Sequence, residues 1–594
     1  MPTTTYQREP WLLDDLFPAV DAPEVETTLA EVESITVAIE AARSELAPTI
    51  AAEDFLGIVA HIETLYRKMS ALISMATLSF SADTQDQKAQ NAMARMRQAA
   101  ADIQNRTIFF SLWWKELDDD NAARLVAAAG DYAYWLEKLR LQRPYTLTEP
   151  VEQVINLKDV NGASALQTLY QSITNRYQFE MEIDGETRRM TRGELQVLFR
   201  DNDPDIRAAA YQALFDVYEA DGPILGQIYQ YLVRDWYSEH VTLRKFEQPI
   251  SVRNLANHIP DDVVATLLQV HKANRGIFHR YFEMKARWLG LDKLRRSDVY
   301  APVSTDSKEI PFADGVALTL NSFAGFDSEI SQMARRVLDE RHMDSEVRPG
   351  KRSGAFCATV QPDLTPWVLL SYQERPDDVA TLAHELGHAI HSMLAAGHSQ
   401  LTHQATLPLA ETASTFAEML LVDEMLAEDD DPAIQQSLLF MQMDDAYATI
   451  ARQAGFALFE KAAHKAIRDG ASVDALSALY LDMLKEELGD SVEVADEFQY
   501  EWLAIPHIYS VPFYVYAYAF GQLLVLSLYQ QYQEEGESFK PKYRRILAAG
   551  GADSPENILT AAGIDMTDPD FWQGGFDVVD KMLSRLEELP VPTS

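Results

Sequence analysis

Apolar residues recur along most of this chain at three- and four-residue spacing, which is the period of an amphipathic α-helix. Short breaks rich in proline, glycine or aspartate separate these stretches. We therefore predict a mainly α fold: a large helical body with only small β-hairpins. The predicted helical stretches are Val25–Glu45, Ala52–Leu72, Asp86–Asp118, 205–291, 313–340 and 432–489.

Two short stretches instead alternate between apolar and polar residues, the period of a strand. Residues 177–183 alternate strictly, and Asp184-Gly185 is a favoured two-residue turn, so a β-hairpin is predicted there. Thr191 followed by Glu194 forms a capping box that restarts the helical pattern. The second strand-like stretch lies between residues 354 and 372, directly before a predicted helix.

The predicted helix after residue 375 carries the motif His-Glu-Leu-Gly-His. His384 and His388 are four residues apart, so both imidazoles project from one helix face and can bind one metal ion. Glu385 stands beside the position that a catalytic metal leaves open, where it can take a proton from water. The alternative is an amphipathic helix whose histidines are only solvated or hydrogen-bonded.

A catalytic zinc site needs a third protein ligand. No Asp or Glu occurs from Ala389 to Ala410, so we assign Glu411 as this ligand. Glu411 belongs to the stretch Pro408–Asp423, which predicts a second helix. Glu418 lies two turns further along the same face, and we predict that it hydrogen-bonds a ligand residue or a neighbouring backbone group.

The stretch before the motif predicts a second hairpin, Gly354–Val360 with Trp367–Tyr372. An exposed edge there could pair with an extended peptide through main-chain hydrogen bonds. Its candidate substrate-binding residues are Gly354, Ala355 and Phe356. A purely structural hairpin is the alternative.

A second polar cluster lies near the end of the chain. If the water activated at the metal attacks a carbonyl, the oxyanion that forms needs hydrogen-bond donors, and His507 and Tyr514 are our candidates. With a helix that begins near Pro512, Tyr518 shares a face with Tyr514, and we predict that it contacts substrate. Membership of the core stays open as an alternative for Tyr509, Tyr516 and Tyr518.

His384-Glu385-Leu386-Gly387-His388, followed by Leu-Ala-Glu-Thr-Ala-Ser-Thr-Phe at 409–416, resembles the oligoendopeptidase F family, relatives of thimet oligopeptidase and neurolysin. The similarity includes Gly350–Phe356 and His507–Tyr518 and covers roughly residues 200–585. The resemblance implies a zinc endopeptidase for short unstructured peptides. It also implies a two-lobed helical body in which a deep central channel holds the catalytic centre.

Composition narrows the class of protein further. The 51 basic and 91 acidic residues give a net charge of −40, which disfavours nucleic acid and anionic membranes as partners. Cys357 is the only cysteine, and the first six residues lack a signal-peptide pattern, so we predict a cytoplasmic protein. Val511–Tyr529 carries no charge, but Pro512, Gln522 and its tyrosines favour a buried helix over a membrane span.

These observations predict an N-terminal helical region, 1–200, and a zinc peptidase region, 201–594. The function we expect is zinc-dependent hydrolysis of internal bonds in short peptides, with one Zn²⁺ per chain. A zinc exopeptidase of the peptidyl-dipeptidase type and a non-catalytic scaffold clamped by zinc are the alternatives. Monomer and homodimer both remain open.

Overall fold

The computed structural model describes residues 6–183, 185–303, 309–428 and 431–591. Within these residues the fold is mainly α with only small sheets, as predicted. The chain forms two compact units, each assembled from three separate stretches. Unit 1 contains Met1–Pro144, Ser307–Asp429 and Gln531–Asp565, and unit 2 contains Tyr145–Asp306, Asp430–Gln530 and Met566–Ser594. The boundary near residue 200 stays a prediction.

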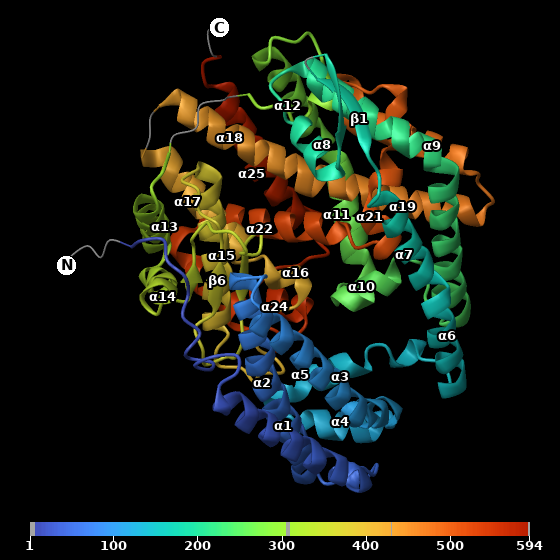
Figure 1. The fold of residues 1–594 in the computed structure, drawn as a ribbon, viewed down its shortest axis with the longest axis vertical. Coiled ribbons are helices and arrows are strands. Elements are labelled where there is room, and N and C mark those ends of the chain that lie inside the picture. The colour runs from blue at the N-terminus through green and yellow to red at the C-terminus, as the bar shows by residue number, and fades with distance from the viewer. Residues whose placement is uncertain (1–5, 184, 304–308, 429–430, 592–594) are drawn as a thin grey trace. The chain divides into compact units, whose positions relative to one another are not determined.

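Unit 1 begins with the predicted long helices, which lie side by side in the blue part of Figure 1. Their apolar faces meet in one core, where the ring of Phe55 stacks on that of Trp114 at 5.3 Å. The helices of this unit are α1 (Pro23–Ala42), α2 (Ala52–Ala82), α3 (Gln87–Glu116), α4 (Asp119–Ala127), α5 (Ala133–Arg140), α13 (Phe312–Phe326), α14 (Ser328–Asp339), α15 (Pro376–Leu394), α16 (Leu407–Ala410), α17 (Ser414–Glu428), α23 (Lys540–Ala548) and α24 (Pro555–Ala561).

The motif helix, α15, lies at the centre of unit 1. Pro376 occupies its first turn, and the Asp378 carboxylate accepts the backbone N–H groups of Gln373 and Arg375. Leu382 and Leu386 are fully buried. The helix packs on α13, α14 and α17, so its position is set by apolar contacts on several sides.

The predicted single helix over Pro408–Asp423 is wrong, because the chain breaks it at residues 411–413. The short helix α16 ends at Ala410, a turn follows, and α17 begins at Ser414. The hydroxyl of Tyr543, far along the chain, donates to the Thr412 carbonyl at 3.1 Å. This tertiary contact occupies a carbonyl that an unbroken helix would use internally. Glu411 therefore lies in the turn.

Beside α15 lies a small sheet with strand order β4-β6-β5. Strands β5 (Phe356–Ala358) and β6 (Trp367–Leu369) are antiparallel, which confirms the predicted hairpin, although its strands are shorter than predicted. Strand β4 (Met343–Asp344) adds a parallel pair that the alternation did not indicate. Since β6 is central, β5 is an edge strand.

Unit 2 contains the hairpin predicted after residue 177. Strands β1 (Phe179–Ile183) and β2 (Glu186–Met190) are antiparallel, and Thr191 forms the expected capping box. Asp184, in the predicted turn, lies outside the described residues. The other α-helices and strands of unit 2 are α6 (Glu149–Asn161), α7 (Ala163–Thr174), α8 (Arg192–Leu198), α9 (Pro204–Trp236), α10 (Ser251–Asn257), α11 (Asp261–Ala273), α12 (Arg275–Trp288), β3 (Leu294–Arg295), α18 (Pro432–Ala446), α19 (Arg452–Arg468), α20 (Val473–Leu488), β7 (Val492–Glu493), α21 (Pro506–Ser510), α22 (Tyr516–Glu535) and α25 (Pro569–Glu587). Of α22, the residues up to Gln530 belong to unit 2.

The tyrosine-rich segment of unit 2 does not begin its long helix at Pro512 as predicted. The short helix α21 ends at Ser510, a turn follows, and α22 begins at Tyr516. Phe513 in this turn has φ +59°, a left-handed conformation that interrupts a right-handed helix. Tyr514 therefore stands in the turn, and only Tyr518 lies on the helix.

The uncharged stretch over Val511–Tyr529 forms most of α22, whose leucines Leu523, Leu524 and Leu528 are fully buried. In the described ranges, we find no helix with both the length and the apolar character needed to cross a bilayer.

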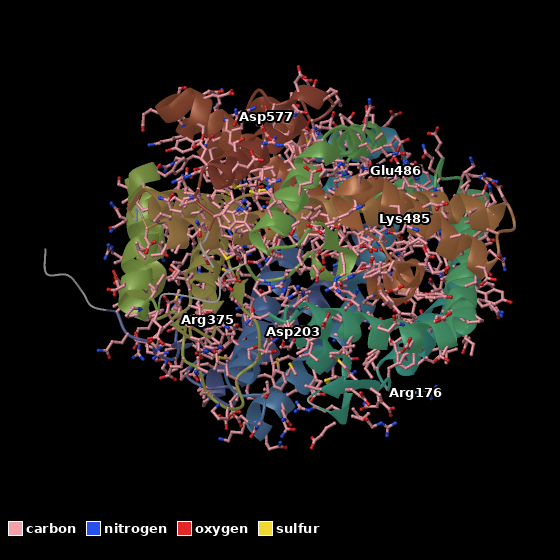
Figure 2. The ribbon with its side chains drawn as sticks, turned by 90° about the horizontal axis from the view of Figure 1, so that it is seen from above. Arg176, Asp203, Arg375, Lys485, Glu486 and Asp577 are labelled. Atoms are coloured by element: carbon pink, nitrogen blue, oxygen red, sulfur yellow. The ribbon has the colours of Figure 1, made fainter. Side chains whose placement is uncertain are left out.

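Charged side chains gather on the outside, and those labelled in Figure 2, such as Lys485 and Asp577, are exposed. The first five residues, used in the signal-peptide prediction, lie outside the described part.

Candidate metal centre

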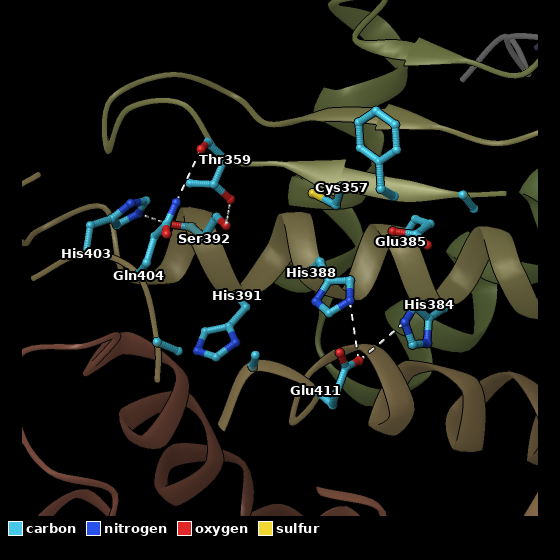
Figure 3. Close-up of a pocket in the computed structure, with 14 residues that line it drawn as sticks. Cys357, Thr359, His384, Glu385, His388, His391, Ser392, His403, Gln404 and Glu411 are labelled. Atoms are coloured by element: carbon cyan, nitrogen blue, oxygen red, sulfur yellow. Dashed lines mark hydrogen bonds and ion pairs between the residues drawn. The ribbon is translucent and has the colours of Figure 1, made fainter. Parts of the chain in front are cut away.

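The first unit brings His384, His388 and Glu411 together. The Nε2 atoms of both histidines lie 3.4 Å from one Glu411 carboxylate oxygen, as the dashed lines in Figure 3 show. The two imidazole rings are 4.8 Å apart and nearly perpendicular. All three candidate ligand atoms lie within 4.8 Å of one another, so one ion can contact all of them. The turn between α16 and α17 brings Glu411 to the motif helix.

Further contacts hold these candidate ligands in place. Nδ1 of His384 donates to the Glu418 carboxylate of α17. Glu418 is therefore placed to orient the imidazole of this candidate ligand, as predicted. With that proton on Nδ1, the lone pair of His384 is on Nε2 and faces Glu411. The Ser414 hydroxyl donates to the Glu411 carboxylate at 2.7 Å. The sequence analysis had assigned no role to Ser414, because its contact with Glu411 depends on the turn.

This donor set suits a divalent cation such as zinc. Two imidazole nitrogens and one carboxylate oxygen are ligands that zinc accepts, and three protein ligands leave a position for substrate or water. Burial lowers the pKa of His384, but the hydrogen bond and charge of Glu418 outweigh it and raise the pKa to about 9. The negative field that favours a proton on this imidazole equally attracts a metal cation.

Glu385 lies on the side of α15 that faces strand β5 (Figure 3). Its side chain is buried, and its Oε2 has no hydrogen-bond partner among the described residues. Burial raises the pKa of Glu385 to about 7, an effect that His384 opposes and the other carboxylates reinforce. A carboxyl group with a pKa near neutrality can both accept and donate a proton, as a general base and acid must.

A pocket of about 460 Å³ lies along α15 and contains the candidate ligands and Glu385. Ala355 and Phe356 of the predicted substrate-binding set line it, whereas Gly354 does not. His403 is buried, and its Nε2 donates to the Ser392 carbonyl at 2.8 Å. The remaining lining residues are Cys357, Thr359, His384, Glu385, His388, His391, Ser392, Gln404, Ala405, Ala410 and Glu411.

The candidate oxyanion residues belong to unit 2 and form a cluster of their own. The rings of Tyr514 and Tyr518 meet edge to face at 5.3 Å, and His507 lies about 6 Å from each (6.1 and 6.2 Å). His507 and Tyr518 are exposed. Tyr509 and Tyr516 are fully buried, so the core alternative holds for these two and not for Tyr518.

The class of protein defined by this site is a metal-dependent peptidase. Its groups are two histidines on one helix, the Glu411 carboxylate against both rings and the buried Glu385 next to them. The sequence comparisons agree with this class. The model of the family described as "Peptidase family M3" matches residues 197–578, and that of "Oligopeptidase F" matches residues 113–179. The chain belongs to peptidase family M3, a family of metallopeptidases that act on oligopeptides.

Curated relatives match along nearly the whole chain. The Group B oligopeptidase PepB of Streptococcus agalactiae is 27% identical over 570 residues, which cover 94% of each chain. The chromosomal oligoendopeptidase F of Lactococcus lactis subsp. cremoris is 26% identical and covers 91% of this chain and 90% of its own.

Solved structures share the fold. A protein from Chlamydophila abortus superposes with a TM-score of 0.89 at 23% identity, and the alignment covers 98% of this chain and all (100%) of the other. The oligoendopeptidase F of Enterococcus faecium gives a TM-score of 0.69 at 22% identity, with 97% and 99% covered.

Proposed function

We propose that this metallopeptidase is a zinc-dependent endopeptidase that hydrolyses internal bonds of short, unstructured oligopeptides. The observation that carries the proposal is the Glu411 carboxylate at 3.4 Å from both motif imidazoles, with the buried Glu385 next to them. The curated relative from Lactococcus lactis named oligoendopeptidase F supports the endopeptidase specificity. The lone cysteine, Cys357, supports a cytoplasmic location.

His384, His388 and Glu411 would hold the ion. Zinc, when bound, supplies a Lewis acid that polarises the scissile carbonyl and makes water a better nucleophile. Glu385 takes the proton from the attacking water and passes it to the departing amine, for which a pKa near 7 is suited. Glu418 keeps the His384 ring in its orientation throughout.

The peptide would bind as an extended strand along the edge of β5. Backbone groups of this edge strand give affinity without demanding a sequence, which suits an enzyme for many peptides. Ala355 and Phe356 line the pocket there. We propose His507 and Tyr514 as donors to the oxyanion and Tyr518 as a substrate contact.

The test combines one substitution with two substrates. Glu385→Gln should retain one zinc per chain but lose about 10²- to 10⁴-fold in kcat, because the proton acceptor is gone. Glu116→Gln, at an exposed glutamate of the same unit, is the matched control and should leave kcat unchanged. Zinc content is measured by mass spectrometry of the purified protein.

Internally quenched peptides with both ends blocked separate the remaining alternatives. An endopeptidase cuts them, whereas a peptidyl-dipeptidase requires a free terminus. A non-catalytic scaffold would cut neither blocked nor free peptides, and Glu385→Gln would then change nothing measurable. Absence of stoichiometric zinc from metal-replete protein would overturn the proposal.

A further inference from the structure

The turn that carries Tyr514 rests on a carboxyl group buried in unit 2. The backbone N–H of Phe513 donates to Oε1 of Glu460, a residue of α19, at 2.9 Å. Glu460 is fully buried and lies 53 positions earlier in the chain. This contact is thus tertiary, and it fixes the residue directly before Tyr514.

Phe513 needs such an anchor because its backbone is strained. Its φ of +59° lies in the left-handed region, which a bulky side chain rarely occupies unless its surroundings force it. The Phe513 ring packs against the His464 ring with centroids 4.6 Å apart. His464 follows Glu460 by one helical turn, so a single face of α19 holds both the N–H group and the ring of Phe513.

Glu460 acts in this contact as a neutral hydrogen-bond acceptor. Burial raises its pKa to about 8, although the Phe513 N–H and the charge of Arg253 oppose the shift. Its second oxygen, Oε2, has no hydrogen-bond partner in the described part of the chain. Glutamine has the same shape and keeps the acceptor oxygen, whereas leucine removes it. Glu460→Gln and Glu460→Leu therefore compare a side chain that keeps the acceptor oxygen with one that lacks it.

The hydrogen bond from Phe513 to Glu460 also constrains Tyr514, because one peptide bond joins Phe513 to Tyr514. The turn closes through the Tyr514 N–H, which donates to the Val511 carbonyl at 3.1 Å. On the other side of Phe513, the Pro512 carbonyl accepts from Nε of Arg253 at 3.4 Å. If the Phe513 N–H loses its acceptor, the left-handed residue can relax, and the direction of the Tyr514 side chain changes with it.

We propose that Glu460 is a positioning residue for Tyr514: it holds Phe513 in the left-handed conformation that aims the Tyr514 hydroxyl. This inference rests on the proposed role of Tyr514 as an oxyanion donor. A donor that must meet developing charge is sensitive to displacements of about 1 Å, so a relaxed turn lowers kcat rather than weakening ground-state binding.

The experiment measures kcat and KM of the zinc-loaded enzyme for Glu460→Gln, Glu460→Leu, Tyr514→Phe and the double variant Glu460→Leu/Tyr514→Phe. Glu460→Gln should retain kcat within about twofold. Glu460→Leu should lower kcat about tenfold with KM nearly unchanged. Tyr514→Phe should lower kcat about 10²-fold. In the double variant, Glu460→Leu should add less than a further twofold, because the hydroxyl it positions is absent.

The matched control is Glu487, a second buried glutamate, which lies on α20 beside Gly455 of α19. Glu487→Leu should lower Tm as Glu460→Leu does but leave kcat per zinc-loaded chain unchanged. If Glu460→Leu leaves kcat unchanged, or if its effect multiplies fully with that of Tyr514→Phe, Glu460 does not act through Tyr514. If Tyr514→Phe itself leaves kcat unchanged, the proposed role of Tyr514 fails instead, whatever the Glu460 variants do.

Discussion

Gly387 allows the motif helix to approach the turn that carries Glu411. A Cβ atom built on Gly387 would lie 2.6 Å from the Ala413 carbonyl oxygen and 2.6 Å from the Ser414 Cα. Both are backbone atoms, which cannot rotate away as the end of a flexible side chain would. Gly387→Ala must therefore push α15 and the turn apart.

The required movement can be estimated from these distances. Restoring ordinary contact at about 3.4 Å needs a displacement of about 0.8 Å from the present 2.6 Å. Metal–ligand distances tolerate only about 0.2 Å. Since Glu411 and the two histidines lie on opposite sides of this contact, we expect zinc affinity to fall about 10- to 100-fold, as when ligand-orienting groups are lost. Overpacking should also cost about 1–3 kcal/mol of stability.

Zinc affinity is measured by competition with a chromophoric chelator, and stability by thermal unfolding with and without zinc. Gly325→Ala is the matched control, because Gly325 lies within α13 of the same unit and a Cβ there meets nothing within 4 Å. That variant should keep its zinc affinity and gain up to about 1 kcal/mol from helix propensity. If Gly387→Ala binds zinc within twofold of the unaltered protein, the close approach does not set the ligand geometry.

Three further predictions concern the same two units. Glu418→Ala should weaken zinc binding about 10- to 100-fold in the chelator assay, because the His384 ring loses its acceptor; an unchanged affinity would contradict the orienting role. Chelation should abolish peptide hydrolysis and lower Tm, and added zinc should restore both, since an ion that binds only the native state stabilises it by mass action. Burial raises the pKa of Glu460 to about 8 and of Glu487 to about 7, from 4.5. At these two carboxyl groups the folded chain binds more protons than the unfolded chain, so their contribution to the free energy of unfolding should fall by a few kcal/mol as pH rises from about 4.5 to 8. Glu460→Gln removes one of the two contributions, so the difference in free energy of unfolding between this variant and the unaltered protein, measured in urea titrations, should change over that pH range; a constant difference would refute the assignment.

Local patterns were sufficient to predict much of the fold and the candidate ligand set. The helices over residues 23–116 follow from apolar spacing, and the start of α15 follows from Pro376 and its acidic first turn. The spacing of His384 and His388 places both rings on one face of any helix. The absence of carboxylates between residues 389 and 410 then left Glu411 as the first candidate ligand.

Other features could not be predicted because they depend on residues far apart in the chain. The break before α17 involves Tyr543, 131 positions from its partner Thr412, so the helical pattern of 408–423 concealed it. The third strand of the small sheet, β4, pairs in parallel across more than twenty residues and leaves no alternation in its two-residue length. No local pattern marks His403 as a pocket residue; its contact with the Ser392 backbone holds it in the pocket wall.

The sequence by itself determined the helical class, the candidate metal ligands and the neighbouring glutamate, because helix periodicity and i, i+4 spacing act within a few residues. Only the tertiary structure decided which tyrosines belong to the core. Tyr509, Tyr516 and Tyr518 lie in the same tyrosine-rich segment, but the first two are covered by other residues and Tyr518 is exposed. The tertiary structure also decided that Glu460 supports the turn at Phe513, a contact between distant residues that no local pattern encodes.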